Sequence, residues 1–230
     1  GVTDGAGTLR WIRDIFRNLR GEPMQGTGST TTDFDIYKAH NVPPKAVTLG
    51  NAIPVTKRSN APEATPCRWK RIIWQGNTNR MVAKVIRVIA DIASNNNSPL
   101  TTGNRIIFRI PSDLRRYIKN QPFTAANCTG ALDLEVKDSN TITKLQTDIL
   151  TAMRQHQDLA VFPKYMNLAY WLPLSFLAPG QKSILRTHKR GTYLKTAIIS
   201  SLGKLNMADF NYKGFTAETA FGVPIPFATT

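Results

Sequence analysis

Cysteine is scarce in this chain, and long hydrophobic runs are missing. The two cysteines, Cys67 and Cys128, lie far apart and form no Cys-x-x-Cys pair. This spacing disfavours a zinc site or a disulfide framework and is typical of a reducing compartment, so we expect a cytoplasmic protein. The most apolar window, residues 168–179, is too short to cross a bilayer and is interrupted by Pro173. We therefore expect no membrane span, and no signal peptide is visible.

Several enzyme motifs are also missing. Without a Gly-x-Ser-x-Gly, His-Glu-x-x-His or Cys-His pattern, the sequence offers no support for a hydrolase or a metalloenzyme, and we predict no metal site. The three histidines, His40, His156 and His188, have no neighbouring motif. Roles at the surface or at a helix end are favoured for them over catalysis.

Acidic residues are few. The 15 aspartates and glutamates face 30 lysines and arginines, which gives a net charge of +15. Such a balance indicates an anionic partner, for which nucleic acid, an anionic membrane surface, a phosphorylated cofactor and an acidic carrier protein are the candidates. The alternative is a solvated surface that only keeps the protein soluble. The basic residues are spread along the chain without long runs of one sign, which disfavours a nucleic-acid module.

The pattern of the remaining residues favours an α/β fold. An amphipathic helix begins the chain, with Leu9, Ile12, Phe16 and Leu19 at helical spacing. Residues 21–66, rich in Gly, Thr, Pro and Asn, are predicted to form a crossover loop or linker. We therefore place a boundary near residue 60, between residues 1–60 and residues 61–230.

Strands and helices alternate after this boundary. Helices are predicted from a cap at Asn77 or Thr78 through Ile92, and from a cap within 138–140 to about residue 157. Two further helices are predicted at 168–177 and 183–188. Strands are predicted at 67–76, 104–110 (ended by Pro111), 131–136, 193–199 and 215–221. This order predicts a two-layer α/β sandwich with a mixed sheet.

Three segments carry a resemblance to a known superfamily. The opening GVTDG before an amphipathic helix is similar to the end of a His-His-x-x-x-Asp-Gly signature, with Asp4 and Gly5 matching. FRIPSDLRRY (108–117) is similar to a Val-Pro-x-Asp-Leu-Arg strand end, and NCTG follows it. AIISSLGKLNMADF (197–210) is similar to a Ser/Thr-Asn-Leu-Gly turn near an acceptor tunnel, with Ser201 where asparagine is common. In this order they resemble nonribosomal-peptide condensation domains and coenzyme-A-dependent acyltransferases related to chloramphenicol acetyltransferase.

The resemblance implies that the chain is the second part of a two-lobed molecule. Residues 1–60 would complete the amino-terminal lobe and the crossover, and residues 61–230 would form most of the carboxy-terminal lobe, whose last elements we expect beyond Thr230. The catalytic histidine of the signature would be the residue immediately before Gly1. We therefore assign no catalytic residue within the chain and expect it to be inactive by itself. The Asp-Phe-Gly-Trp-Gly segment of peptide synthetases has no counterpart, so the simple acyltransferase branch fits better.

The resemblance also implies roles for particular residues. Asp4 is expected to pair with Arg115 and hold the active-site loop, whereas the alternative role for Asp4 is to cap the first helix. Gly5 and Gly7 would allow a tight backbone turn, with ordinary turn chemistry as the alternative. Ser200 and Ser201 are candidates to line the acceptor tunnel, with strand-end hydroxyls satisfied by local hydrogen bonds as the alternative.

The function implied is transfer of an acyl group from a phosphopantetheine thioester to an amine or an alcohol. The donor would be acyl-coenzyme A or an acidic acyl or peptidyl carrier protein, bound as a substrate and not as a tight cofactor. A histidine would act as general base. Two alternatives stay open: a non-catalytic interaction module of the same fold, and a basic nucleic-acid-binding protein, which net charge alone suggests.

Overall fold

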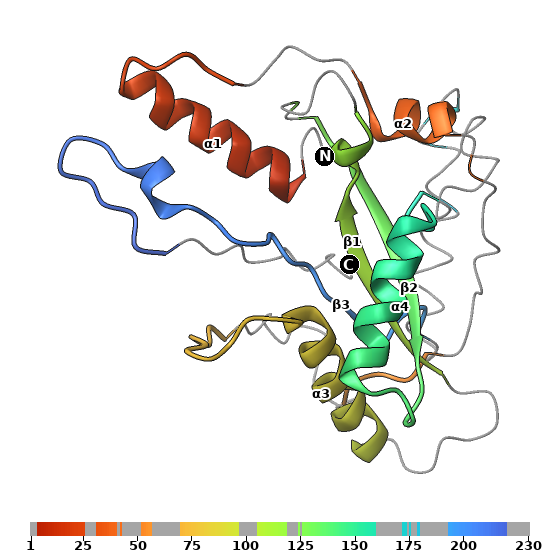
Figure 1. Cartoon of the computed structure of the whole chain (residues 1–230). Helices are drawn as coiled ribbons and strands as arrows, with labels where there is room; N and C mark the ends of the chain where they lie inside the picture. Colours follow the sequence, from red (N-terminus) through yellow and green to blue (C-terminus); the bar gives the residue numbers. More distant parts are fainter. Residues whose placement is uncertain are drawn as a thin grey trace. The chain divides into compact units, whose positions relative to one another are not determined.

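The structure, a computed structural model, describes residues 4–25, 31–40, 42, 52–56, 70–96, 105–118, 124, 126–159, 172–173, 175, 179 and 193–219. Its helices and its small mixed sheet place it in the α/β class, as the sequence predicts. Figure 1 labels the elements, which are α1 (Gly5–Leu19), α2 (Asp33–His40), α3 (Met81–Asn96), β1 (Ile106–Asp113), the 3-10 helix η1 (Leu114–Tyr117), β2 (Thr129–Val136), α4 (Ile142–Arg154), β3 (Ala197–Ile198) and the 3-10 helix η2 (Met207–Phe210).

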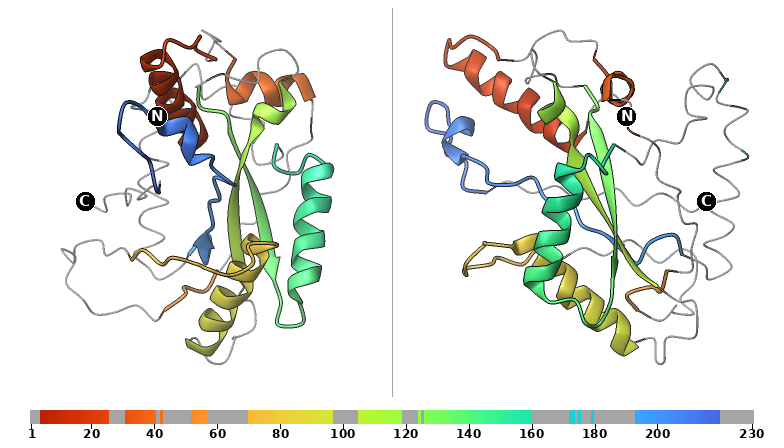
Figure 2. Two further views of the ribbon diagram at one scale, coloured as in Figure 1. Left: turned by 60° about the vertical axis from the view of Figure 1, so that its left-hand side comes forward. Right: turned by 45° about the vertical axis from the view of Figure 1, so that its right-hand side comes forward.

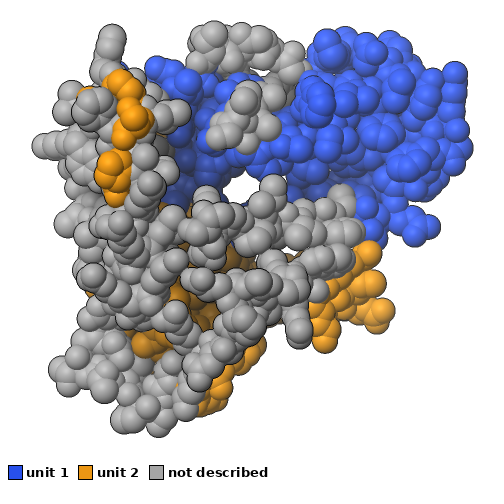
Figure 3. Space-filling model, turned by 180° about the vertical axis from the view of Figure 1, so that it is seen from behind, with its two compact units in different colours: residues 1–43, 111–131, 200–224 blue, residues 44–110, 132–199, 225–230 orange. Residues whose placement is uncertain are grey.

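The chain divides into two compact units, each built from separated stretches of sequence and coloured in Figure 3. Unit 1 comprises Gly1–Pro43, Pro111–Ala131 and Ser200–Pro224, and unit 2 comprises Pro44–Ile110, Leu132–Ile199 and Ile225–Thr230. The boundary predicted at residue 60 lies outside the described residues and stays a prediction.

The core of unit 2 is shared by two helices and the strands. Helix α3 buries its alanine-rich face, including Ala83 and Ile86, and α4 buries Leu145 and Ile149. These residues pack with Phe108 of β1, whose side chain is fully buried. Figures 1 and 2 show α3 and α4 beside these strands, and the two helices contact each other. Small side chains on α3 let the helix approach its neighbours closely, so burial of apolar surface stabilises this unit.

The sheet has the strand order β2-β1-β3, and β1 runs parallel to β3 with Phe108 opposite Ala197. Side chains alternate across a strand, so Arg109 lies on the face opposite to Phe108. There the Arg109 Nε donates to Asp133 Oδ1 at 2.8 Å, and Lys195 Nζ donates to Asp133 Oδ2 at 2.7 Å. This carboxylate therefore joins residues of β1 and of the segment that precedes β3.

Unit 1 is organised around α1, which packs against η2. The ring of Phe16 meets Phe210 edge-on at 6.1 Å and stacks on Phe215 at 5.7 Å. Arg20 strengthens the same contact, because its Nη1 donates to the carbonyl oxygens of Asp209 and Asn211. One face of α1 is thereby fixed, while Trp11 on another part of the helix is exposed.

The prediction of a loop over residues 21–66 is wrong for residues 33–40, which form α2. Thr32 and Asp35 begin this helix with a reciprocal capping arrangement: Asp35 N donates to Thr32 Oγ1 at 3.3 Å, and Thr32 N donates to Asp35 Oδ2 at 2.8 Å. Thr followed three residues later by an acidic residue is a helix-start signature. This signature is present in the sequence, but the Thr, Gly and Pro residues around it favour a loop.

The strand predicted at 67–76 is also wrong in its described part, since residues 70–76 form no strand and are exposed. The expectation that Pro111 ends a strand is wrong as well, because β1 continues to Asp113. The pairing of β1 with β3 includes Arg109, whose carbonyl accepts from Ile199 N at 2.9 Å. A proline, which has no N–H, is tolerated two residues further along.

Other predictions are confirmed with shifted ends. The helices α1, α3 and α4 and the strand predicted at 131–136 are present. Helix α3 begins only after Arg80, which has a positive φ of 57°, and Thr141 caps α4.

The remaining predicted elements are shorter or lie outside the described residues. The strand predicted at 193–199 is limited to Ala197–Ile198. Residues 215–219 form no strand beyond a bridge at Phe215. The helices predicted at 168–177 and 183–188 lie outside the described residues, apart from a few isolated positions. None of the helices in the described part has the length and apolarity to cross a membrane.

Candidate functional site

The candidate site of unit 1 is built around the carboxylate of Asp4, the residue before α1. Asp4 caps this helix, because its Oδ1 accepts a hydrogen bond from Gly7 N at 2.6 Å. The same carboxylate pairs with Arg115, whose Nη2 lies 3.0 Å from Oδ1 and 3.1 Å from Oδ2. The two roles expected as alternatives are therefore both present, and the predicted contact between Asp4 and Arg115 is confirmed.

The segment entering β2 also binds this carboxylate. Cys128 N donates to Asp4 Oδ2 at 2.7 Å, and Thr129 Oγ1 lies 3.2 Å from the same oxygen. Burial opposes the charge on Asp4, but the hydrogen bonds from Gly7, Cys128 and Arg115, together with the Arg115 charge, hold its pKa below the ordinary value. Asp4 is therefore ionised at neutral pH, and donors already surround both of its oxygens.

Arg115 is buried, and each of its three guanidinium nitrogens donates at least one hydrogen bond. Its Nε donates to Thr124 O at 2.7 Å, its Nη1 donates to Asp113 Oδ1 at 2.8 Å, and its Nη2 also donates to the Ala126 carbonyl. Burial opposes the charge, yet the contacts with Asp4 and Asp113 outweigh it and raise the pKa of the guanidinium. A planar guanidinium suits this task, since its donors point in fixed directions toward several acceptors.

Asp113 sets the position of Arg115. Asp113 is the last residue of β1 and caps η1, with its Oδ1 accepting from Arg115 N at 3.0 Å. Its second oxygen lies 3.8 Å from Arg10 Nη2 of α1. The Asp-Leu-Arg sequence thus turns the chain from a strand into a 3-10 helix. Its arginine contacts Asp4, the residue that caps α1.

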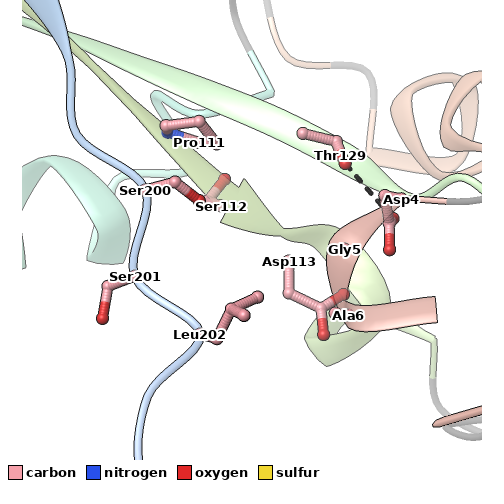
Figure 4. Close-up of a pocket in the computed structure, with 10 residues that line it drawn as sticks. All are labelled: Asp4, Gly5, Ala6, Pro111, Ser112, Asp113, Thr129, Ser200, Ser201 and Leu202. Carbon is pink, nitrogen blue, oxygen red and sulfur yellow. Dashed lines mark hydrogen bonds between the residues drawn. The ribbon is translucent and has the colours of Figure 1, made fainter. Parts of the chain in front are cut away.

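A cavity of about 150 Å³ opens beside Asp4 (Figure 4). Its lining comes from separate parts of unit 1 and includes Asp4, Gly5, Asp113, Thr129, Ser200 and Ser201. Ser200 and Ser201 thus share a cavity with Asp4 and Gly5, while Arg115 supports the cavity through Asp4. Sequence reasoning missed Ser112, Asp113 and Thr129, although the first two belong to the Pro-Ser-Asp-Leu-Arg stretch that it singled out.

The expectation that Gly5 and Gly7 allow a tight backbone turn is wrong, because both residues lie within α1. Gly5 is the first residue of α1, and the described glycines with positive φ are Gly21, Gly203 and Gly214. A Cβ at position 5 would stand 3.4 Å from Leu202 Cδ2. That distance is an ordinary van der Waals contact, so neither the backbone conformation nor the space beside Leu202 requires a glycine at position 5.

The lining residues define what the cavity can bind. They present carboxylate and hydroxyl oxygens, and none of the ten residues drawn in Figure 4 is Lys, Arg or His. Such a lining accepts hydrogen bonds from hydroxyl or amine groups and does not attract phosphate. Over the described residues, no group of three or more His, Cys, Asp or Glu side chains is arranged to hold a metal ion.

The two histidines in the described part of the chain do not line this cavity. His40 lies at the end of α2 with its ring 5.0 Å from that of Tyr117, and His156 follows α4 with a φ of 56°. His188 lies outside the described residues.

Comparison of the chain with protein-family models, with curated proteins and with solved structures finds no match.

Proposed function

We propose that the chain belongs to an acyltransferase or condensation-type domain that moves an acyl group from a phosphopantetheine thioester to an amine or an alcohol. One observation carries the proposal. The three segments that resemble this superfamily, which begin near residues 4, 108 and 197, contribute Asp4, Asp113 and Ser200 to one cavity. These segments are far apart in the sequence, so their convergence is not a consequence of local folding. In the proposed function the fold is of the chloramphenicol-acetyltransferase type, and the protein works in the cytoplasm.

In this proposal Asp4 is a positioning residue and not the general base. Its oxygens already accept hydrogen bonds from Gly7, Arg115 and Cys128, so it has no capacity to take a proton from a substrate at neutral pH. The resemblance assigns the base to a histidine immediately before Gly1. An anchored carboxylate a few residues away would fix the backbone from which that histidine projects.

The cavity suits the acceptor side of the reaction. An attacking amine or alcohol carries hydrogen-bond donors, which the hydroxyls of Ser200 and Ser201 and the carboxylate of Asp113 can accept. Coenzyme A carries phosphates, for which this lining offers no cation. We therefore assign the cavity to the acceptor, and the phosphates of coenzyme A or the surface of an acidic carrier protein to other parts of this basic chain.

The test is an acyl-transfer assay on a longer form of the protein that includes the residues before Gly1. Acyl-coenzyme A and acyl-carrier proteins serve as donors, and a panel of amines and alcohols serves as acceptors. Transfer should depend on the histidine before Gly1, and Asp4→Asn should lower kcat about a hundredfold, because a shift of about 1 Å in a catalytic group has that effect. Asp148→Asn, on the surface of α4, is the matched control and should leave kcat unchanged.

Transfer no faster than in the histidine-to-alanine variant would contradict the proposal. If the longer sequence contained no histidine at that position, the non-catalytic interaction module would replace the enzyme as the best interpretation. Steeply salt-dependent binding of DNA or RNA, without any transfer, would favour the nucleic-acid alternative.

A further inference from the structure

Residues 70–76 of unit 2, here called the arm, expose large apolar side chains. Ile72 is 76% exposed, Ile73 is 71% exposed and Trp74 is 60% exposed. The arm precedes α3 and projects from its first turn in Figures 1 and 2. Three consecutive exposed apolar side chains of this size are uncommon on a soluble domain, where they indicate a contact with a partner or with a membrane.

The connection between the arm and α3 is structured. The indole of Trp74 lies against Gly76, where an added Cβ would come within 2.8 Å of its Nε1. Asn79 N donates to Asn77 Oδ1 at 2.7 Å, and Lys84 Nζ donates to Asn77 O at 3.0 Å. The contact of Lys84 therefore joins the connection after the arm to α3, and Trp74 packs on the glycine that ends the arm.

Along the sequence, the charged residues around the arm are all basic. No aspartate or glutamate occurs between Glu63 and Asp91, an interval that contains Arg68, Lys70, Arg71, Arg80, Lys84 and Arg87. Lys70, Arg71 and Arg80 are exposed and flank the apolar residues on both sides. A partner that covers the arm must therefore accept apolar side chains in its interior and present negative charge at its surface.

We propose that the arm binds the surface of an anionic lipid bilayer. Indole rings favour the boundary between acyl chains and headgroups, and lysine and arginine beside them contact anionic headgroups. Ile72 and Ile73 are adjacent and both are exposed, whereas a flat protein surface would cover side chains on one side of a segment only. A lipid interface surrounds an inserted segment on all sides, and for this reason we favour lipid over an acidic protein. The proposal is independent of acyl transfer.

Co-sedimentation of the full 230-residue chain with vesicles tests this inference. Vesicles that contain phosphatidylcholine and phosphatidylserine in equal amounts should bind the chain, and phosphatidylcholine alone should bind it weakly. The combined substitution Ile72→Ser, Ile73→Ser and Trp74→Ala should lower the partition coefficient about tenfold or more, because apolar area leaves the interface. The matched control is Trp11→Ala with Ile15→Ser on α1, where Trp11 is 62% exposed, and it should leave binding unchanged.

A second pair of variants tests the charge. Lys70→Glu with Arg71→Glu should weaken binding to the anionic vesicles more than Lys144→Glu with Arg154→Glu, which makes the same change in net charge on α4. Circular dichroism should show the same fold for all four variants, since each substituted side chain is exposed or near the surface. Absence of wild-type binding to the anionic vesicles would overturn the inference. So would equal loss of binding in the arm and control variants, or a loss of self-association in the arm variant without any effect on lipid.

Discussion

Both carboxylate oxygens of Asp4 accept hydrogen bonds from Nη2 of Arg115, at 3.0 and 3.1 Å, although the two residues are 111 positions apart in the sequence. The pair joins the start of α1 to η1 within unit 1. Because Arg115 is buried, loss of either charge leaves the other without its main partner in a region of low dielectric.

Replacement of Arg115 by methionine should lower the free energy of unfolding by about 3–5 kcal/mol, since Asp4 then remains buried without its guanidinium. Urea unfolding followed by circular dichroism measures the change. Lys144→Met, which removes an exposed pair with Asp148, is the control and should change stability by less than about 0.5 kcal/mol. If Asp4→Asn and Arg115→Met were additive in the double variant, the energetic coupling that we infer would be absent.

The Asp4 carboxyl should make stability depend on pH in the acidic range. Its ordinary pKa is 3.8, and its pKa in the folded protein is lower. The unfolded chain therefore binds a proton at higher pH than the folded protein does. The contribution is fully present above the unfolded value and is lost as the pH falls through the folded value. The difference in unfolding free energy between the wild type and Asp4→Asn should accordingly shrink on acidification, and a constant difference would contradict this assignment.

Cys128 should resist alkylation in the folded protein. Burial raises the pKa of its thiol to about 11, so the reactive thiolate is scarce at neutral pH and access to it is blocked. Mass spectrometry after a pulse of iodoacetamide should find the Cys128 peptide unmodified in buffer and modified in concentrated urea. Fast labelling in buffer would show that the segment entering β2 opens readily.

The contact between α3 and α4 should dominate the stability of unit 2. Ile86 is fully buried in their shared core, and Ile86→Ala should lower the unfolding free energy by about 2–5 kcal/mol through lost burial and a new cavity. Val88, two residues further along the same helix, is exposed. Val88→Ala should change stability by less than about 0.5 kcal/mol in the same unfolding experiment. Similar losses in the two variants would contradict the orientation of α3.

Periodicity in the sequence was sufficient to predict the long elements. The apolar spacing in α1, α3 and α4 and the alternation in β2 are local patterns, which predict a helix or a strand without knowledge of its partners. They do not fix the buried face, since the buried residues of α1 are Gly7 and Asp14. The errors arise where a partner decides the structure. Residues 70–76 alternate like a strand, but they pair with no other strand in the described part of the chain. Strand β1 continues through Pro111 to Asp113, because the strand does not require a backbone N–H donor at position 111.

The candidate site was predictable to a similar degree. The contact between Asp4 and Arg115 followed from a resemblance between motifs. Ser200 and Ser201 line a cavity beside Asp4, and their role at an acceptor tunnel stays a prediction. The part played by Asp113 did not follow. Its contact with Arg115 is local, two residues along the chain, but its contact with Arg10 and its place in the cavity beside Ser200 depend on segments that are distant in sequence.

The many donors around Asp4 also restrict how this protein can diverge. A glutamate would carry its oxygens one methylene further from the backbone, and it would then miss the amides of Gly7 and Cys128 or the guanidinium of Arg115. In chains of common ancestry, the aspartate and the arginine should therefore be inherited or lost together, and their covariation would be visible before any activity is measured.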